Sequence, residues 1–363
     1  MTIRHASKWL AALSMALTMA SAAATSAHAA VNDAAITGSA APKALSEYGF
    51  FDDLAAQTPA DRVLPYDLIT PLFTDYAEKL RFVYVPDGET AQYNPDDVFA
   101  LPVGSALIKT FAYPQDARAP GEDLRLIETR ILAHTPKGWR TYPYVWNADM
   151  TDAVLSPLGA KLDVSWITAD GTSRTIRYAV PNMNQCRSCH VKGTGRDRVT
   201  VPIGPEAKHL NKDYSYTDGT TNQLLKWTEA GILTGTPDDP DDAPRIARWD
   251  DATLPIADRA RGYLDINCAH CHAPDGPAHT SGLYLDTRAT TPAQYGIFKR
   301  PVAAGRGSGG HDFSINPGDP DSSIIVYRMD STDPGIMMPE LGRSTIHREG
   351  VALIREWIAG MDN

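Results

Sequence analysis

The pattern Cys-x-x-Cys-His occurs twice in this chain and constrains its fold more than any other feature. The first copy lies in QCRSCH at residues 185–190, and the second lies in NCAHCH at residues 267–272. The chain has only 4 cysteines, and the two copies use all of them. A disulfide within either pair would close a very small loop and stabilise little, whereas pairing across the copies would leave both histidines unexplained. The fold therefore has to offer two places where both sulfurs and the adjacent imidazole reach one ligand.

This arrangement is the attachment pattern of a c-type haem. One helical turn places both sulfurs along one edge of a porphyrin, to which they bind as thioethers, and aims the next imidazole at the iron. The main alternative is a zinc site made from four cysteines, but the long separation of the pairs and the histidine after each argue against it. The sequence thus predicts two c-type haems. Their predicted binding residues are Cys186, Cys189 and His190 at the first site, and Cys268, Cys271 and His272 at the second.

The second axial ligand of each iron decides what that iron can do. For the second haem, the loop MMPE at residues 337–340 supplies methionine sulfur, and we favour Met338, directly before Pro339, over Met337. Methionine closes the sixth position and raises the reduction potential, which suits an electron carrier. For the first haem, the nearest downstream candidate is His209. The alternatives there are His134, Met150, His311 and an open or water-bound iron.

Hydrophobic patterning divides the chain into parts. Residues 30–181 are rich in β-branched and aromatic segments separated by turn signals, which predicts a β-rich domain. Residues 182–249 hold the first motif and an acidic, proline-containing linker. Residues 250–363 begin and end with helical periodicity and predict a mainly α-helical domain that carries the second haem. We therefore expect an α+β protein. Its predicted strands are 106–112, 124–134, 138–147, 161–168 and 174–180.

The N-terminus and the charge indicate where the protein works and what it binds. Residues 1–29 match a secretory signal peptide, with Arg4 and Lys8 before an apolar run and a small-residue cleavage site at its end. No later stretch is apolar enough to span a bilayer, so no transmembrane segment is expected after cleavage. The net charge of −10 argues against nucleic-acid binding. We predict a periplasmic or otherwise exported protein whose partners are redox proteins with a basic docking face.

The C-terminal part resembles class I cytochrome c in its order of helix, NCAHCH, methionine loop and terminal helix. Nearly the whole chain after the signal peptide is also similar to an uncharacterised family of secreted bacterial dihaem c-type cytochromes, often encoded beside a parallel β-helix protein. The similar stretches include TPLFTDYAEKLRFVYVP, IKTFAYP, YVWNADMTDA, QCRSCH and ARGYLDINCAHCH. This resemblance implies an exported two-haem protein and brings no established substrate. Class I cytochromes cross their first and last helices, which implies such a role for Gly262, Tyr263 and Trp357.

These observations predict electron transfer between redox partners through two covalently bound haems. The alternative is a haem enzyme, such as a peroxidase, in which the methionine-ligated haem feeds an open first haem. No acid pair or nucleophile motif marks a catalytic centre, so no catalytic residue is assigned and electron transfer is favoured. A third hypothesis makes the β-rich domain a module that docks the cytochrome to a larger complex.

Overall fold

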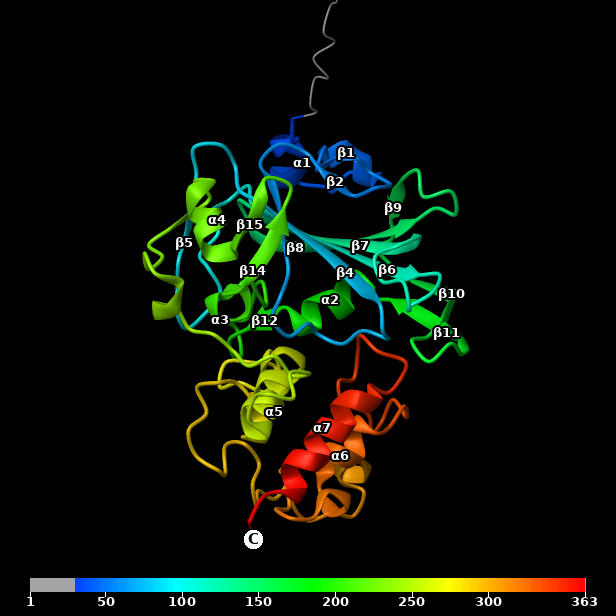
Figure 1. Cartoon of the computed structure of the whole chain (residues 1–363), viewed down its shortest axis with the longest axis vertical. Helices are drawn as coiled ribbons and strands as arrows, with labels where there is room; N and C mark the ends of the chain where they lie inside the picture. Colours follow the sequence, from blue (N-terminus) through cyan, green and yellow to red (C-terminus); the bar gives the residue numbers. More distant parts are fainter. Residues whose placement is uncertain (1–29, 363) are drawn as a thin grey trace, which may run out of the picture.

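The computed structural model describes residues 30–362, so the predicted signal peptide at residues 1–29 lies outside the described residues. Figure 1 shows a large β-rich part above a smaller part that contains α5, α6 and α7. The large part is built on a six-stranded antiparallel sheet with the order β3-β4-β6-β7-β8-β9. These strands are β3 (Val63–Tyr66), β4 (Glu78–Tyr84), β6 (Ala106–Pro114), β7 (Leu124–Thr135), β8 (Gly138–Trp146) and β9 (Ala153–Leu155).

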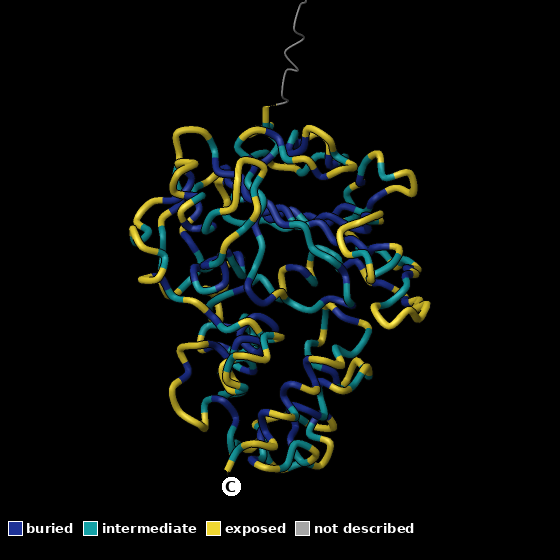
Figure 2. Tube along the Cα trace, in the orientation of Figure 1, coloured by how far each residue is buried: buried dark blue, intermediate teal, exposed yellow. Residues whose placement is uncertain are grey.

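The two faces of this sheet bury different partners. One face packs Phe82 and Ile108 into a core shared with α1 (Asp33–Thr37). The opposite face packs Leu107 and Leu132 against the segment that follows the first motif. The central strands are therefore largely buried on both faces, and they bury polar residues such as Thr110, Glu128 and Thr129 as well as apolar ones. Figure 2 shows this buried centre, with exposed residues gathered in the surrounding loops.

A separate hairpin covers one end of the sheet. It consists of β10 (Ala160–Ile167) and β11 (Ser173–Val180), which pair antiparallel. Trp166 and Tyr178 of the hairpin lie in one core with Phe111 of β6. The alternation of apolar and polar residues set the predicted strand positions correctly, since the five predicted strands are observed as β6, β7, β8, β10 and β11.

Residues 182–249 pack onto the β-rich part and contribute to its core. Trp227 is fully buried and meets the Tyr66 ring edge-to-face at 5.5 Å between centroids. A short parallel pairing of β16 with β5 ties the end of this segment to the same part. The elements involved are α2 (Met183–Cys189), β12 (Val191–Lys192), β13 (Val199–Thr200), α3 (Ala207–Leu210), β14 (Asp213–Tyr216), β15 (Gly219–Asn222), α4 (Gln223–Glu229), β16 (Leu233–Thr234) and β5 (Ala91–Gln92). Elsewhere, β1 (Phe51–Asp53) pairs with β2 (Thr58–Pro59) near the N-terminus.

The smaller part is organised by three helices, α5 (Ile256–Leu264), α6 (Ile324–Met329) and α7 (Arg348–Ala359). α5 continues into a π-helical turn that leads to the second motif. α7 packs against α5 where Gly350 meets Tyr263, because a Cβ at Gly350 would lie only 2.3 Å from the tyrosine hydroxyl. The two helices approach this closely only because position 350 has no side chain.

The expectation of a mainly α-helical C-terminal domain is wrong. The three α-helices there span only 9, 6 and 12 residues, and residues 30–362 are 27% strand and 22% helix with several antiparallel sheets. Residues 273–347 explain the difference, since their prolines lack the N–H that a helix needs and several glycines adopt positive φ. Among residues 30–362, no helix combines the length and apolar character needed to cross a bilayer.

A buried carboxylate joins the two parts of the molecule. Asp75 is 2% exposed and lies in the loop before β4. It accepts hydrogen bonds from the backbone N–H groups and the side-chain hydroxyls of Ser344 and Thr345, at 2.8 to 2.9 Å. The segment before α7 is thereby fixed to the β-rich part.

A cluster of aromatic rings forms a second connection. The rings of Phe73 and His347 stack at 4.3 Å between centroids. The N–H of Phe73 donates to Asn267 Oδ1 at 2.8 Å, and the Tyr263 hydroxyl lies 2.9 Å from His347 Nδ1. The second motif is therefore held directly against the loop of the β-rich part.

Candidate functional site

The first motif lies on α2, a short helix with a strong N-terminal cap. The Asn182 side chain accepts from the Gln185 N–H, and the Gln185 side chain accepts from the Asn182 N–H, each at 2.9 Å. Cys186 and Cys189 are three residues apart and so lie on one face of this helix. Cys186 is buried, Cys189 is half-buried, and His190 follows as the C-terminal cap.

His190 has the orientation and charge of a metal ligand. Its Nδ1 lies 3.1 Å from the Val201 carbonyl oxygen, so Nδ1–H donates there and Nε2 carries the free lone pair. Burial lowers the pKa of His190 to about 4, which keeps the imidazole neutral at pH 7. A neutral imidazole with a fixed tautomer is the form that ligates iron.

A cavity of about 150 Å³ opens beside Cys186 and His190. One wall is the sheet face that carries Arg81, Lys109 and Arg130, and α3 contributes to the wall with His209. The remaining walls are mostly apolar and include Leu68, Leu107, Leu132, Ile203 and Ile266. The mixed lining suits a flat apolar ring with charged substituents, although a volume of about 150 Å³ admits only part of a porphyrin.

The second motif begins in the π-helical turn Asp265–Ala269 and ends at His272. The His272 N–H donates to the Cys268 carbonyl at 2.9 Å, and its Nδ1 lies 3.4 Å from the Ser281 hydroxyl. Burial lowers the pKa of His272 to about 4, so this imidazole is also neutral. The second site thus presents the same neutral ligand on a different local structure.

The cavity at the second motif is larger and contains the predicted methionine. Its volume is about 690 Å³, and Cys268, Cys271, His272 and Met338 all line it. Met337 is buried elsewhere, at 8% exposure, and is not among the residues lining this cavity. The structure therefore brings Met338 to the motif, as the sequence predicted.

The backbone of Met338 is held from both sides. Its N–H donates to the Arg328 carbonyl at 3.0 Å, and its carbonyl accepts from Arg343 Nη2 at 2.9 Å. The Arg343 guanidinium is 9% exposed and also bonds the carbonyls of Met329 and Thr345. A buried arginine thus fixes the loop that presents the methionine.

The two motifs, far apart in the sequence, touch in the fold. Ser188 and Cys189 of the first motif line the cavity of the second, together with Cys268 and Cys271. His270 lies in the same wall. This contact was not predicted, and no local pattern announces it, because it depends on how the two parts of the molecule dock.

His209 lines the first cavity but is already engaged. Its Nε2 lies 2.8 Å from Asp265 Oδ1, while its buried Nδ1 has no hydrogen-bond partner among residues 30–362. Glu206, His209 and Asp265 lie close enough to hold a metal ion, yet the Lys208 ammonium bonds both carboxylates at 2.9 Å. The lysine supplies the positive charge of this group, and only Nδ1 of His209 remains for an iron in the first cavity.

The other first-site candidates lie elsewhere. His134 Nδ1 lies 2.9 Å from the Leu101 carbonyl and its ring stacks on Trp139. Met150 packs against the core that contains α1, and His311 lies against the Tyr327 ring. None of these three lines the cavities described above.

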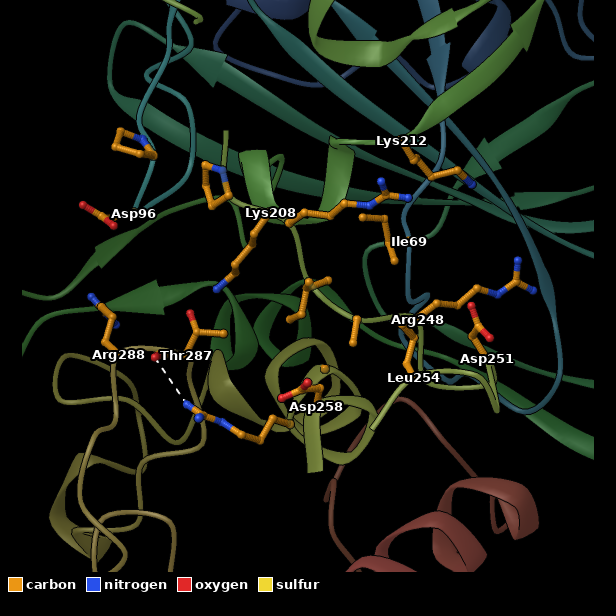
Figure 3. A pocket seen from close by; sticks show the side chains of 17 residues that line it. Ile69, Asp96, Lys208, Lys212, Arg248, Asp251, Leu254, Asp258, Thr287 and Arg288 are labelled. Carbon is orange, nitrogen blue, oxygen red and sulfur yellow. Dashed lines mark hydrogen bonds between the residues drawn. The ribbon is translucent and has the colours of Figure 1, made fainter. Parts of the chain in front are cut away.

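A third cavity, of about 890 Å³, separates the β-rich part from α5 (Figure 3). Lys208 and Lys212 extend into it from one side and Asp258 from the other (Figure 3). Its cations are largely neutralised, since Lys212 pairs with Asp67 and Arg288 pairs with Asp286. No motif residue lines it, so it is distinct from the two sites above.

Sequence reasoning also missed the charged wall of the first cavity. Lys109 lies within ALIKTFA, an otherwise mainly apolar strand, and such a lone cation is the signal that marks the position. Arg130 lies within LRLIETRIL, where Arg125 and Glu128 also occur, so no such signal marks it.

Comparison with protein-family models, with curated proteins and with solved structures gave no match. The family resemblance therefore remains a prediction.

Proposed function

We propose that this protein is an exported c-type cytochrome with two covalently bound haems that transfers electrons between redox partners. The observation that carries the proposal is the meeting of the two Cys-x-x-Cys-His motifs, with Cys189 of the first beside Cys271 of the second. Each motif opens onto a cavity of its own, and Cys189 of the first motif lies in the wall of the second cavity. Two adjoining sites of this kind suit passage of electrons between them.

The residues of this chain perform the holding and orienting. Cys186 and Cys189 would bind the first haem and Cys268 and Cys271 the second, while His190 and His272 would ligate the irons. When bound, each haem supplies reversible one-electron oxidation and reduction of its iron. Arg343 fixes Met338 at the second site through its carbonyl, which favours a closed, low-spin iron there.

The charge of the molecule supports a protein partner. The net charge is −10, and an acidic surface attracts a partner with a basic docking face. Long-range attraction of this kind weakens as salt screens it, over about 8 Å at physiological ionic strength. We expect association with the partner to slow as salt concentration rises.

One observation favours the alternative of a haem enzyme. His209 already binds Asp265 through Nε2, so the first site has no distal ligand with a free Nε2. If Nδ1 of His209 does not ligate either, the sixth position of the first iron would be open to a small oxidant such as peroxide. The second site would then serve as the electron donor to the first.

Optical and EPR spectra of the purified two-haem protein test the proposal, with carbon monoxide added to the reduced form. A carrier with two closed sites gives two low-spin irons, a sulfur-to-iron charge-transfer band when oxidised, and no response to carbon monoxide. Met338→Ala should abolish the band, whereas Met337→Ala, its adjacent buried control, should keep it. A band that survives Met338→Ala would refute the ligand assignment.

The same spectra and carbon monoxide test show whether the first iron has a second axial ligand. If His209 ligates through Nδ1, His209→Ala should convert one low-spin iron to a form that binds carbon monoxide. A wild-type protein that already binds carbon monoxide at one iron would put the enzyme ahead of the carrier. Peroxide turnover would then be the next assay.

A further inference from the structure

Three cations form a row across the sheet face that lines the first cavity. Arg81 on β4, Lys109 on β6 and Arg130 on β7 lie directly opposite one another in the strand register. All three line the cavity that contains Cys186 and His190. Like charges placed opposite one another on a sheet destabilise it, so this row is costly without a partner of opposite charge.

The carboxylates nearby do not balance the row. Arg130 pairs with Glu128, and Arg81 pairs with Asp67 at 2.9 Å. Lys109 forms no ion pair within residues 30–362, and its ammonium lies 5.0 Å from the centroid of the Phe111 ring. Lys79, two residues before Arg81 on the same face of β4, donates to the Ala77 carbonyl and forms no ion pair among the described residues. Neither lysine is therefore paired directly with a carboxylate in the described part of the chain.

Arg81 adds an independent observation. Its side chain is 4% exposed, and its Nη2 is buried without any hydrogen-bond partner among the described residues. An orphaned buried donor of a charged group costs more than a neutral one. Burial, together with Arg81 and Arg130, also holds the pKa of Lys109 well below its ordinary range. The wall is built to receive anionic oxygen atoms.

We propose that the end of this row formed by Lys109 and Arg81 binds the propionate carboxylates of the first haem. The inference rests on the proposed function and adds residues that no motif contains. A c-type haem carries its propionates opposite its two thioether bonds, and Cys186 lies at the Arg130 end of the row, next to Thr141. Neighbouring strands are about 4.8 Å apart, so Arg81 lies roughly 10 Å further along the wall. The row therefore runs from the attachment side toward the propionate side.

The test is the reduction potential of each haem in the intact two-haem protein, measured by spectroelectrochemistry. Lys109→Met removes one positive charge that disfavours the oxidised iron, so the first haem should become at least tenfold harder to reduce, a fall of 59 mV or more. The second haem should keep its potential. Lys109→Arg keeps the positive charge and should keep the potential of the first haem near its wild-type value. Lys161→Met, at an exposed position on β10, should change the potential of neither haem.

Three results would overturn the inference. An unchanged potential of the first haem in Lys109→Met would show that no propionate binds there. A wild-type potential that moves with added inorganic phosphate, and no longer moves in Lys109→Met, would assign the row to a free anion. Absence of a thioether-linked haem on the peptide with Cys186, by mass spectrometry, would refute the proposed function as well and so separates the two failures.

Discussion

The two motif sites hold the same five-residue pattern in different surroundings. The first lies between a capped helix and a rigid sheet face, and its wall carries Arg81, Lys109 and Arg130. The second lies among loops and short helices, in a larger cavity whose distinctive polarisable group is the Met338 sulfur. Under the proposed function, the difference teaches that the motif would fix attachment and one ligand, while the surrounding fold sets charge, rigidity and the second ligand.

Removing the second pair of cysteines should have the largest effect and would test the contrast in rigidity. Leu285, Ile325 and Met329 belong both to the core of the smaller part and to the cavity wall, so an unfilled cavity exposes that core. In the double variant Cys268→Ala, Cys271→Ala, the rate of protease cleavage within residues 273–345 should rise on the order of tenfold above the wild-type rate under native conditions. Limited proteolysis followed by mass spectrometry measures this rate.

The matched variant removes the first pair, Cys186→Ala, Cys189→Ala. The sheet at the first site is stabilised by its strand pairing and hydrophobic cores and does not depend on a bound ligand. Cleavage of residues 273–345 should therefore stay within about twofold of the wild-type rate. Equal acceleration in the two variants would break the contrast, because both sites would then depend on their ligand to the same degree.

The second prediction concerns the carboxylate that joins the two parts. Asp75→Ala removes the buried acceptor of five hydrogen bonds from Ser344 and Thr345, which should lower the free energy of unfolding by about 3 kcal/mol. Because these residues follow Arg343, the spectrum of the second haem should change and that of the first should not. Urea unfolding and optical spectroscopy measure the two effects.

Asp152 provides the control for that prediction. It also accepts hydrogen bonds from a backbone N–H and a hydroxyl, both of Ser46, but it lines neither site. Asp152→Ala should cost about 1 kcal/mol and leave both haem spectra unchanged. A spectral change at the first haem in Asp75→Ala would mean that the two sites are not separable.

The smallest effect is a pH dependence of the contact between the two parts. Burial lowers the pKa of His347 from 6.5 to about 4; Glu349 opposes this shift and Lys79 adds to it. As pH falls from 6.5 to about 4, the His347 ring becomes protonated in the unfolded chain. In the folded protein the ring is stacked on Phe73 and hydrogen-bonded to Tyr263, and it stays neutral over most of this range. Stability should therefore be lost in that window, by on the order of 2 kcal/mol.

His347→Gln keeps a hydrogen-bonding side chain and removes the titration. Its thermal midpoint should fall less than that of the wild type between pH 7 and pH 4.5. An identical fall in the two proteins would place the acid sensitivity at other groups.

Local patterns predicted what local forces determine. Alternation located β10 and β11, the spacing of the cysteines located both motifs, and methionine followed by proline ahead of the last helix located the loop that contains Met338. Helical periodicity at both ends of residues 250–363 did not reveal how little helix lies between them, because prolines and positive-φ glycines decide that region. The cation row depends on the register of three strands, and the contact of Cys189 with Cys271 depends on docking through Asp75 and Phe73. Both are long-range facts that a single sequence does not contain.

The contact between Cys189 and Cys271 also fixes an order of assembly. In the folded molecule the two sulfurs lie against each other and partly out of reach of solvent. Under the proposed function, an attachment enzyme has to reach each thiol before the smaller part docks. Biogenesis then proceeds from an open chain, through two attachment events, to closure of the two parts around finished cofactors. Docking of the two parts would then be the last step of maturation, after which neither sulfur is accessible to the attachment enzyme.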